Sequence, residues 1–401
     1  MTIRKPSPSH RLLTLAALLA ALPAAAAPGI TDLGALTANG GSTANDVSRD
    51  GSVVVGNSSG LIGQRATVWS GSNWANKTDL GTLKADNSGK SLAWAVSHDG
   101  SVVVGESDDD SGALERAAVW SGSGWTAKTD LGTLKSDNSG WAAAYAVSSD
   151  GSVVAGRAEN DDGKTRATIW SGSGWGTKTD LGTLRSDNSG YSEVYGVSED
   201  ASVVVGDADN DNGDSHATVW SGSGWGTKTD LGTLKSDNSG TSFANAVSSD
   251  GSVIAGWAEN DDRTPRAIVW SGNGWTTKTD LGTLKRDNSG ESRAWAVSSD
   301  GLMVAGQADN DNGERRATVW SGSGWGTKTD LGTLKTDNSG WSWVEGISAD
   351  GNFAVGESES ENGGFRATVW NLRSFNIRAA DTANTRASLS LLSADTAAML
   401  A

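Results

Sequence analysis

The residues best placed to bind a metal form the acidic stretch DADNDNGD, from Asp207 to Asp214. Carboxylates at alternating positions followed by a glycine are typical of a calcium-binding loop, whose positions 1, 3 and 5 share one cation. The spacing departs from such a loop, because the glycine is seventh rather than sixth and Thr218 stands where the loop needs glutamate. The equivalent stretch at 57–64, NSSGLIGQ, has no acidic residue. We therefore predict an acidic turn with no metal site and no cofactor, with weak calcium binding as the alternative.

Residues for catalysis are few. The chain has no Cys, and two of its three His, His98 and His216, fall in different sequence repeats, where most copies have Ser or Arg. We interpret both as solvated residues of exposed turns. No GxSxG motif occupies a strand-to-helix turn, and the many carboxylates are spread over the repeats. We predict no catalytic residues and a protein that is not an enzyme.

Aromatic residues gather where the repeats differ from one another. Three variable positions, each two residues from the next, follow a repeated DNSG motif, and residues spaced by two lie on one face of a strand. The alternate positions are mostly small, as in Ala144, Ala146 and Gly196. Aromatic rings on a rigid scaffold suit carbohydrate or protein ligands, whereas the alternative is that they fill gaps in the packing. The ligand-binding candidates are Trp94, Trp141, Tyr145, Tyr191, Tyr195, Phe243, Trp295, Trp341 and Trp343.

The elements that carry these residues belong to one unit repeated seven times. The motif TDLGTLK, or a close variant, recurs about every 50 residues and starts near Asp32, Asp79, Asp130, Asp180, Asp230, Asp280 and Asp330. Each unit predicts four short strands, TDLGTL, SxAxAVS, SVVVG and RATVW, separated by turns rich in Asp, Asn, Ser and Gly. Four antiparallel strands in each of seven units predict an all-β, seven-bladed β-propeller. An open β-solenoid is the alternative.

The ends of the repeats predict how the ring closes. A strand at 31–36 has no partner before it, and the last unit ends at Trp370 without a following TDLGTL strand. We expect 31–36 to complete the last blade. The Trp that closes each RATVW strand is predicted to pack in the core or between blades.

Composition and the chain ends indicate where the protein acts. A net charge of −16 argues against nucleic-acid partners and anionic membrane surfaces. Basic residues near the N-terminus, an apolar stretch and small residues around Ala26 predict a signal peptide at 1–26. The repeats would then form a propeller domain at 27–371, followed by a helical tail at 372–401. We expect export to the cell surface, outer membrane or extracellular space, with the periplasm as the alternative.

The repeat pattern DLGTL, SxAxAVSxDGSVVVG and RATVW resembles the extracellular HAF-repeat family over about residues 30–370. Members carry His-Ala-Phe before the closing Trp, whereas this chain has Arg-Ala-Thr in most copies and His216-Ala217-Thr218 in one. The unit is also similar to repeats in bacterial autotransporter passengers, and the tail is similar to the helix before their β-barrel. The resemblance implies a surface-displayed binding or adhesion passenger, attached to a membrane only through a barrel that this sequence lacks. The alternative is a secreted propeller hydrolase or lyase acting on polysaccharide.

Overall fold

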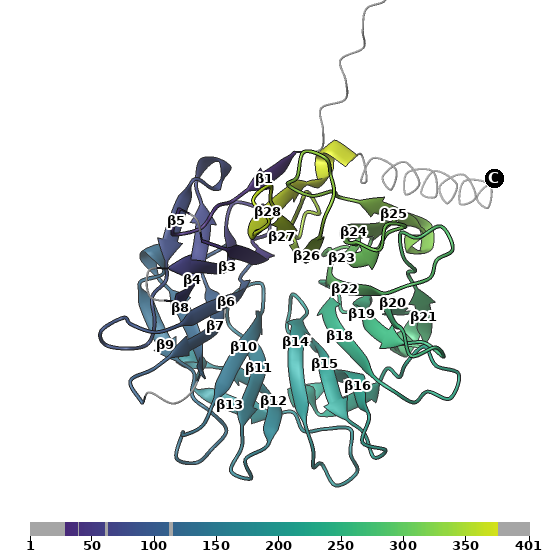
Figure 1. Ribbon diagram of the computed structural model, residues 1–401. Helices are drawn as coiled ribbons and strands as arrows, with labels where there is room; N and C mark the ends of the chain where they lie inside the picture. Colours follow the sequence, from purple (N-terminus) through teal and green to yellow (C-terminus); the bar gives the residue numbers. More distant parts are fainter. Residues whose placement is uncertain (1–28, 39, 61–62, 112–114, 376–401) are drawn as a thin grey trace, which may run out of the picture.

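Seven four-stranded antiparallel sheets form a closed ring in the computed structural model, which describes residues 29–38, 40–60, 63–111 and 115–375 (Figure 1). The fold is therefore the predicted seven-bladed β-propeller rather than a solenoid. The innermost strands of the blades are β2 (Ser42–Val47), β6 (Ser91–Val96), β10 (Ala142–Val147), β14 (Ser192–Val197), β18 (Ser242–Val247), β22 (Ser292–Val297) and β26 (Ser342–Ile347). The second strands are β3 (Val54–Gly60), β7 (Val103–Asp108), β11 (Val154–Glu159), β15 (Val203–Asp209), β19 (Ile254–Glu259), β23 (Val304–Asp309) and β27 (Phe353–Glu359).

The outer half of each blade completes the sheet. The third strands are β4 (Gly63–Ser70), β8 (Glu115–Ser121), β12 (Thr165–Ser171), β16 (Ser215–Ser221), β20 (Pro265–Ser271), β24 (Arg315–Ser321) and β28 (Phe365–Asn371). The outermost strands are β5 (Asn76–Asp79), β9 (Ala127–Asp130), β13 (Thr177–Asp180), β17 (Thr227–Asp230), β21 (Thr277–Asp280), β25 (Thr327–Asp330) and β1 (Ile30–Asp32). Short 3₁₀ turns follow the third strands: η1 (Ser72–Trp74), η2 (Ser123–Trp125), η3 (Ser173–Trp175), η4 (Ser223–Trp225), η5 (Asn273–Trp275), η6 (Ser323–Trp325) and η7 (Leu372–Phe375).

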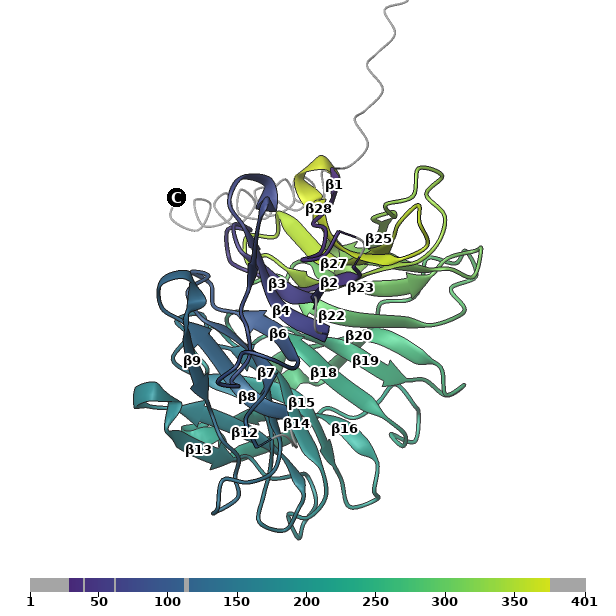
Figure 2. The ribbon, with the colours of Figure 1, turned by 60° about the vertical axis from the view of Figure 1, so that its left-hand side comes forward.

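The first strand closes the ring, as the sequence predicts. β1 pairs antiparallel with β28, with Ile30 opposite Trp370 and Asp32 opposite Thr368. Figures 1 and 2 both show β1 beside β28. The Leu33 N–H donates to the Ala367 carbonyl at 2.9 Å and extends this pairing by one residue. The last blade therefore contains both ends of the repeat region.

The outermost strands end earlier than the TDLGTL pattern predicts. Strand β13, for example, ends at Asp180, and the residues after it form turns. The Asp180 carboxylate accepts the Gly182 N–H at 2.8 Å, and Gly182 has a φ of 71°. The pairing continues for one more bond, from the Leu181 N–H to the Ala167 carbonyl at 2.9 Å, and the Asp180 hydrogen bond then turns the chain, because aspartate readily forms such turns.

The repeated Trp residues pack as predicted. Trp170, at the end of β12, is 0% exposed and belongs to a cluster with Val104 and Val119 of the preceding blade and Ala144 of its own. The same position is fully buried in every blade. Because each indole ring spans the space between two sheets, these Trp residues join neighbouring blades into one core.

A basic residue fastens each third strand to the turn that follows the outermost strand, and it is buried in every blade but the last, where Arg366 is partly exposed. Arg166 is 3% exposed; its guanidinium donates to Asp180 at 3.1 Å and to the Asn188 carbonyl at 2.7 Å. His216 takes this place in one blade, where its Nδ1 lies 2.9 Å from Asp230. The prediction of a solvated His216 is wrong, since the side chain is 2% exposed.

The signal-peptide residues and nearly all of the predicted helical tail lie outside the described residues. No helix within the described part of the chain is long and apolar enough to cross a membrane.

Candidate functional site

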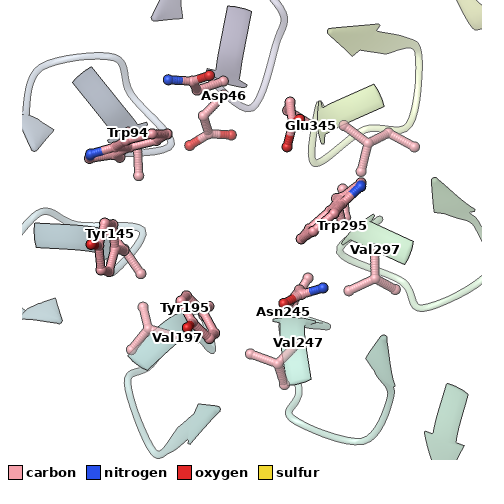
Figure 3. Close-up of a pocket in the computed structure, with 18 of the residues that line it drawn as sticks. Asp46, Trp94, Tyr145, Tyr195, Val197, Asn245, Val247, Trp295, Val297 and Glu345 are labelled. Atoms are coloured by element: carbon pink, nitrogen blue, oxygen red, sulfur yellow. The ribbon is translucent and has the colours of Figure 1, made fainter. Parts of the chain in front are cut away.

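A cavity of about 600 Å³ lies at the centre of the ring, lined by all seven innermost strands. Each of these strands carries a β-bulge, visible as a shift in its pairing with the second strand, such as the one between Ala144 and Ala146. The residue within each bulge lines the cavity: Asn45, Trp94, Tyr145, Tyr195, Asn245, Trp295 and Glu345. Figure 3 shows six of them pointing toward a common space. We call these seven residues the bulge ring.

The β-bulges interrupt the simple alternation of side chains between the two sheet faces that the sequence predicts for these strands. Ala144 pairs with Gly156, but Ala146 pairs with the next residue back, Ala155. Because cross-strand partners share a face and successive residues alternate, Ala144 and Ala146 lie on opposite faces rather than on the predicted common small-residue face. The bulge leaves Tyr145 without a cross-strand partner, and its side chain lines the central cavity.

Aromatic residues form a continuous arc along one side of the cavity. Ring centroids are 5.9 Å apart between Trp94 and Tyr145 and 6.0 Å apart between Tyr145 and Tyr195. Phe243 continues the arc, 6.2 Å from Tyr195, and stacks on Trp257 at 4.7 Å. These spacings are typical of favourable aromatic pairs, so the arc is a preformed apolar wall.

Two further carboxyl groups line the cavity beyond the end of this arc, Asp46 of β2 in the first blade and Glu345 of β26 in the last. Figure 3 shows them as neighbouring labelled side chains around the cavity. Burial raises the pKa of Glu345 from 4.5 to about 8, and the nearby carboxylate of Glu357 acts in the same direction. Burial raises the pKa of Asp46 from 3.8 to about 7, although N–H groups of Val47 and Val96 donate to it at 2.8 and 2.9 Å. Both groups can therefore hold a proton near neutral pH.

The third carboxyl group of the cavity, Glu193, has a cationic partner. The Arg157 guanidinium pairs with it, and the hydroxyls of Tyr191 and Tyr195 donate to it. Arg157 also lies over the rings of Trp141 and Tyr145, 4.9 and 5.4 Å from their centroids. Glu193 is therefore part of a closed polar network and is held in one orientation.

The nine predicted site residues divide into two groups. Five line the cavity, namely Trp94, Tyr145, Tyr195, Phe243 and Trp295. The other four, Trp141, Tyr191, Trp341 and Trp343, are not among its lining residues. Trp341 is 43% exposed beneath the guanidinium of Arg315, and Trp343 packs on Phe365 with centroids 5.0 Å apart.

Six polar or aromatic residues that line the cavity are absent from the predicted candidates: Asn45, Asp46, Glu193, Asn245, Trp257 and Glu345. Aligning STANDV of the first unit with SLAWAV of the second places Asp46 where other units have Ala or Gly, and this exception was a usable signal. Trp257 is the cross-strand partner of Phe243.

A second cavity, of about 130 Å³, continues from the first toward the opposite face. Its wall includes a collar of aliphatic side chains, and five of these line both cavities: Val147, Val197, Val247, Val297 and Ile347. Beyond the collar lie His98 and Glu199. Burial lowers the pKa of His98 and favours its neutral form.

The acidic stretch at 207–214 does not direct its carboxylates at one point. Asp207 is fully buried and accepts a hydrogen bond from Ser215. Asp209 accepts the N–H of Tyr191 at 3.0 Å, and Asp211 accepts that of Ser186 at 2.8 Å. Within the described residues, no group of three or more His, Asp or Glu side chains is arranged to hold a metal ion.

No protein-family model and no curated protein matches the chain. Among solved structures it is similar to the β-propeller domain of the Trilobed protease from Pyrococcus furiosus, with 11% identity and a TM-score of 0.52, covering 82% of this chain and 95% of that one. It is also similar to oligogalacturonate lyase from Vibrio parahaemolyticus, with 10% identity and a TM-score of 0.52, covering 86% of this chain and 94% of that one. For TolB from Acinetobacter baumannii the identity is 14% and the TM-score 0.46; the match covers 82% of this chain and 66% of that one, so the chain spans less than two thirds of that protein. At these identities the first two structures show the β-propeller fold alone.

Proposed function

We propose that this protein is an exported β-propeller that binds a saccharide in its central cavity. The bulge ring is the observation that carries this proposal, because seven backbone irregularities each place one side chain in the same space. Bulges of this kind re-aim side chains at functional sites. Four of the seven residues are Trp or Tyr, and the others carry amide or carboxyl groups.

The chemistry of the cavity suits a pyranose ring. Aromatic faces offer apolar area to the C–H faces of a sugar, while amide and carboxyl groups bind its hydroxyls. A volume of about 600 Å³ lies within the range of about 300–1,000 Å³ that is typical of small-molecule sites. The fixed aromatic pairs limit the entropy that binding would cost.

Calorimetric titration of the purified protein with a panel of oligosaccharides tests this proposal. We expect Trp94→Ala and Trp295→Ala each to weaken binding at least about tenfold, since buried aromatic anchors often contribute 2 kcal/mol or more. Trp341→Ala is the matched control, because that ring is variable and exposed but lies outside the cavity. Equal loss in all three variants, or no loss in any, would contradict the assignment.

The adhesion role belongs to the same proposal. The predicted signal peptide and the resemblance to surface repeats support display outside the cytoplasm, and a cavity that binds saccharide would attach the protein to a glycan. Fractionation of the native host tests this. Retention in the cytoplasm would refute the export part of the proposal, leaving saccharide binding to the titration above.

Hydrolysis of a polysaccharide is a second candidate, favoured by the neighbouring carboxyls of Asp46 and Glu345. With pKa values of about 7 and 8 they match the acid and base that a glycosidase needs near neutral pH. Glu345 would protonate the departing glycosidic oxygen, and Asp46 would activate the attacking water. Release of reducing ends that Glu345→Gln abolishes would support this activity, whereas bound saccharide that stays intact would exclude it.

A further inference from the structure

The charge of the central cavity is one-sided. Its lining residues include three carboxyl groups, Asp46, Glu193 and Glu345, and no Lys, Arg or His. Arg157 neutralises Glu193 from behind the cavity wall. Asp46 and Glu345 have no corresponding cation among the described residues.

Within the part of the chain that the structure describes, the contacts of these two groups include more acid and no base. Asp46 accepts only backbone N–H groups, from Val47 and Val96. Glu357 of β27 is the charged group that acts on Glu345. Glu357 in turn accepts a hydrogen bond from the neutral hydroxyl of Thr43 at 3.1 Å. Glu345 and Glu357 therefore lie close together where the last blade meets the first, whereas Asp46 bonds toward the second blade; none of the three has a basic partner among the described residues.

We propose that the ligand is a cationic amino sugar, whose ammonium group binds Glu345 while its pyranose ring lies against the aromatic arc. This inference rests on the saccharide site proposed above and names the class of saccharide. An ammonium group forms charge-assisted hydrogen bonds with carboxylates. It is also attracted to the faces of Trp and Tyr rings.

Burial of the two carboxyl groups supports this choice. Burial raises their pKa values because it penalises the ionised forms, and among the described residues no positive charge offsets this penalty. A bound ammonium would supply that charge and favour the carboxylates. A uronic acid would bring another negative charge into the same space and be repelled. An N-acetylated sugar has the same ring without the cation, so it serves as the matched ligand.

Titration of the full chain at pH 7 with a glucosamine tetramer, its N-acetylated counterpart and spermidine tests the inference. We expect the glucosamine tetramer to bind at least about tenfold more tightly than the acetylated tetramer, as one charge-assisted contact of about 1.4 kcal/mol or more requires. Glu345→Gln should abolish this preference, so that the variant binds both tetramers with about the same affinity. Asp162→Asn changes the net charge equally at an exposed turn, and should change neither affinity.

Each outcome has a separate meaning. Equal binding of the two tetramers would overturn the charge inference while leaving the saccharide site intact. Binding of neither tetramer would refute the site and the inference together. Spermidine binding as tight as that of the glucosamine tetramer would show that the cavity selects any ammonium, and would overturn the assignment to an amino sugar. A cooperative thermal melt of Glu345→Gln shows that this variant is folded.

Discussion

Replacing Glu345 by Gln should stabilise the ligand-free protein, and more so as the pH rises. The folded protein holds the Glu345 proton up to about pH 8, whereas a solvated glutamate loses it near 4.5. Below the lower value both states are protonated, and the carboxyl costs nothing. As the pH rises from 4.5 through 8, the unfolded chain gains from ionisation and the folded chain does not, so stability is lost across that window.

The size of the effect follows from the pKa shift. At 1.36 kcal/mol per pKa unit, a rise from 4.5 to about 8 sets an upper limit on the order of 5 kcal/mol above pH 8. Water in the cavity and the titration of Glu357 reduce this, so we expect a measured gain of about 2 kcal/mol. In a protein of this size that corresponds to a few degrees of melting temperature.

Thermal melts of the wild type and Glu345→Gln from pH 5 to pH 9 test this reasoning. The two curves should nearly coincide at pH 5 and diverge as the pH rises, with the variant melting higher. Asp162→Asn should run parallel to the wild type at every pH. Parallel curves for Glu345→Gln would show that Glu345 is solvated or already paired, and a variant that melts lower at every pH would show that the carboxylate holds the fold together.

Three further changes test other parts of the structure. Leu33→Ala, next to the closing strand, should lower stability by about 2–5 kcal/mol, as should Leu181→Ala at the equivalent position, because the side chains are 3% and 4% exposed; a near-neutral Leu33→Ala in urea unfolding would show that the ring does not depend on closure. His216→Arg should raise the free energy of unfolding, measured by urea denaturation, by about 1 kcal/mol. The reason is that the Nε2 of His216 is buried without a partner, whereas the guanidinium of the equivalent Arg166 reaches a carbonyl at 2.7 Å; a lower free energy of unfolding would contradict this. Calcium and EDTA should leave the melting temperature unchanged, since the carboxylates of Asp207, Asp209 and Asp211 bind different partners; a calcium-dependent rise would restore the metal-site alternative.

The repeats made the architecture predictable. The copies are nearly identical, and within each copy Asn-Ser-Gly and Asp-Gly turns mark where one strand ends and the next begins. The number of strands in each blade follows from these turns, and the unpaired strand at the start identifies how the ring closes. The buried Trp residues followed from their presence in every unit. These features depend on local sequence and on counting, which a single chain with seven copies supplies.

The site was only partly predictable, for two physical reasons. A bulge changes the backbone pairing without changing the residue pattern, so Ala144 and Ala146 look equivalent in sequence although they lie on opposite faces. Residues that converge in space also come from different blades. Asp46 and Glu345 line the same cavity only because the ring closes. Aromatic content alone gave no reason to select them.

His216 illustrates a third limit. It occupies the position of the Arg in RATVW, and that Arg is buried in the other complete units. A single histidine between polar neighbours nevertheless suggests a surface residue. Comparison with Arg166 shows that this position needs a hydrogen-bond donor for the aspartate that ends the outermost strand. The repeat context, rather than the residue type, held that information.

The most direct test of the central claim is a crystal structure of the protein grown with the glucosamine tetramer. We predict a pyranose ring within the bulge ring, against Trp94 and Tyr145, with its amino group toward Glu345. Saccharide density only on the exposed rim near Trp341, or none at an occupancy-saturating concentration, would contradict it.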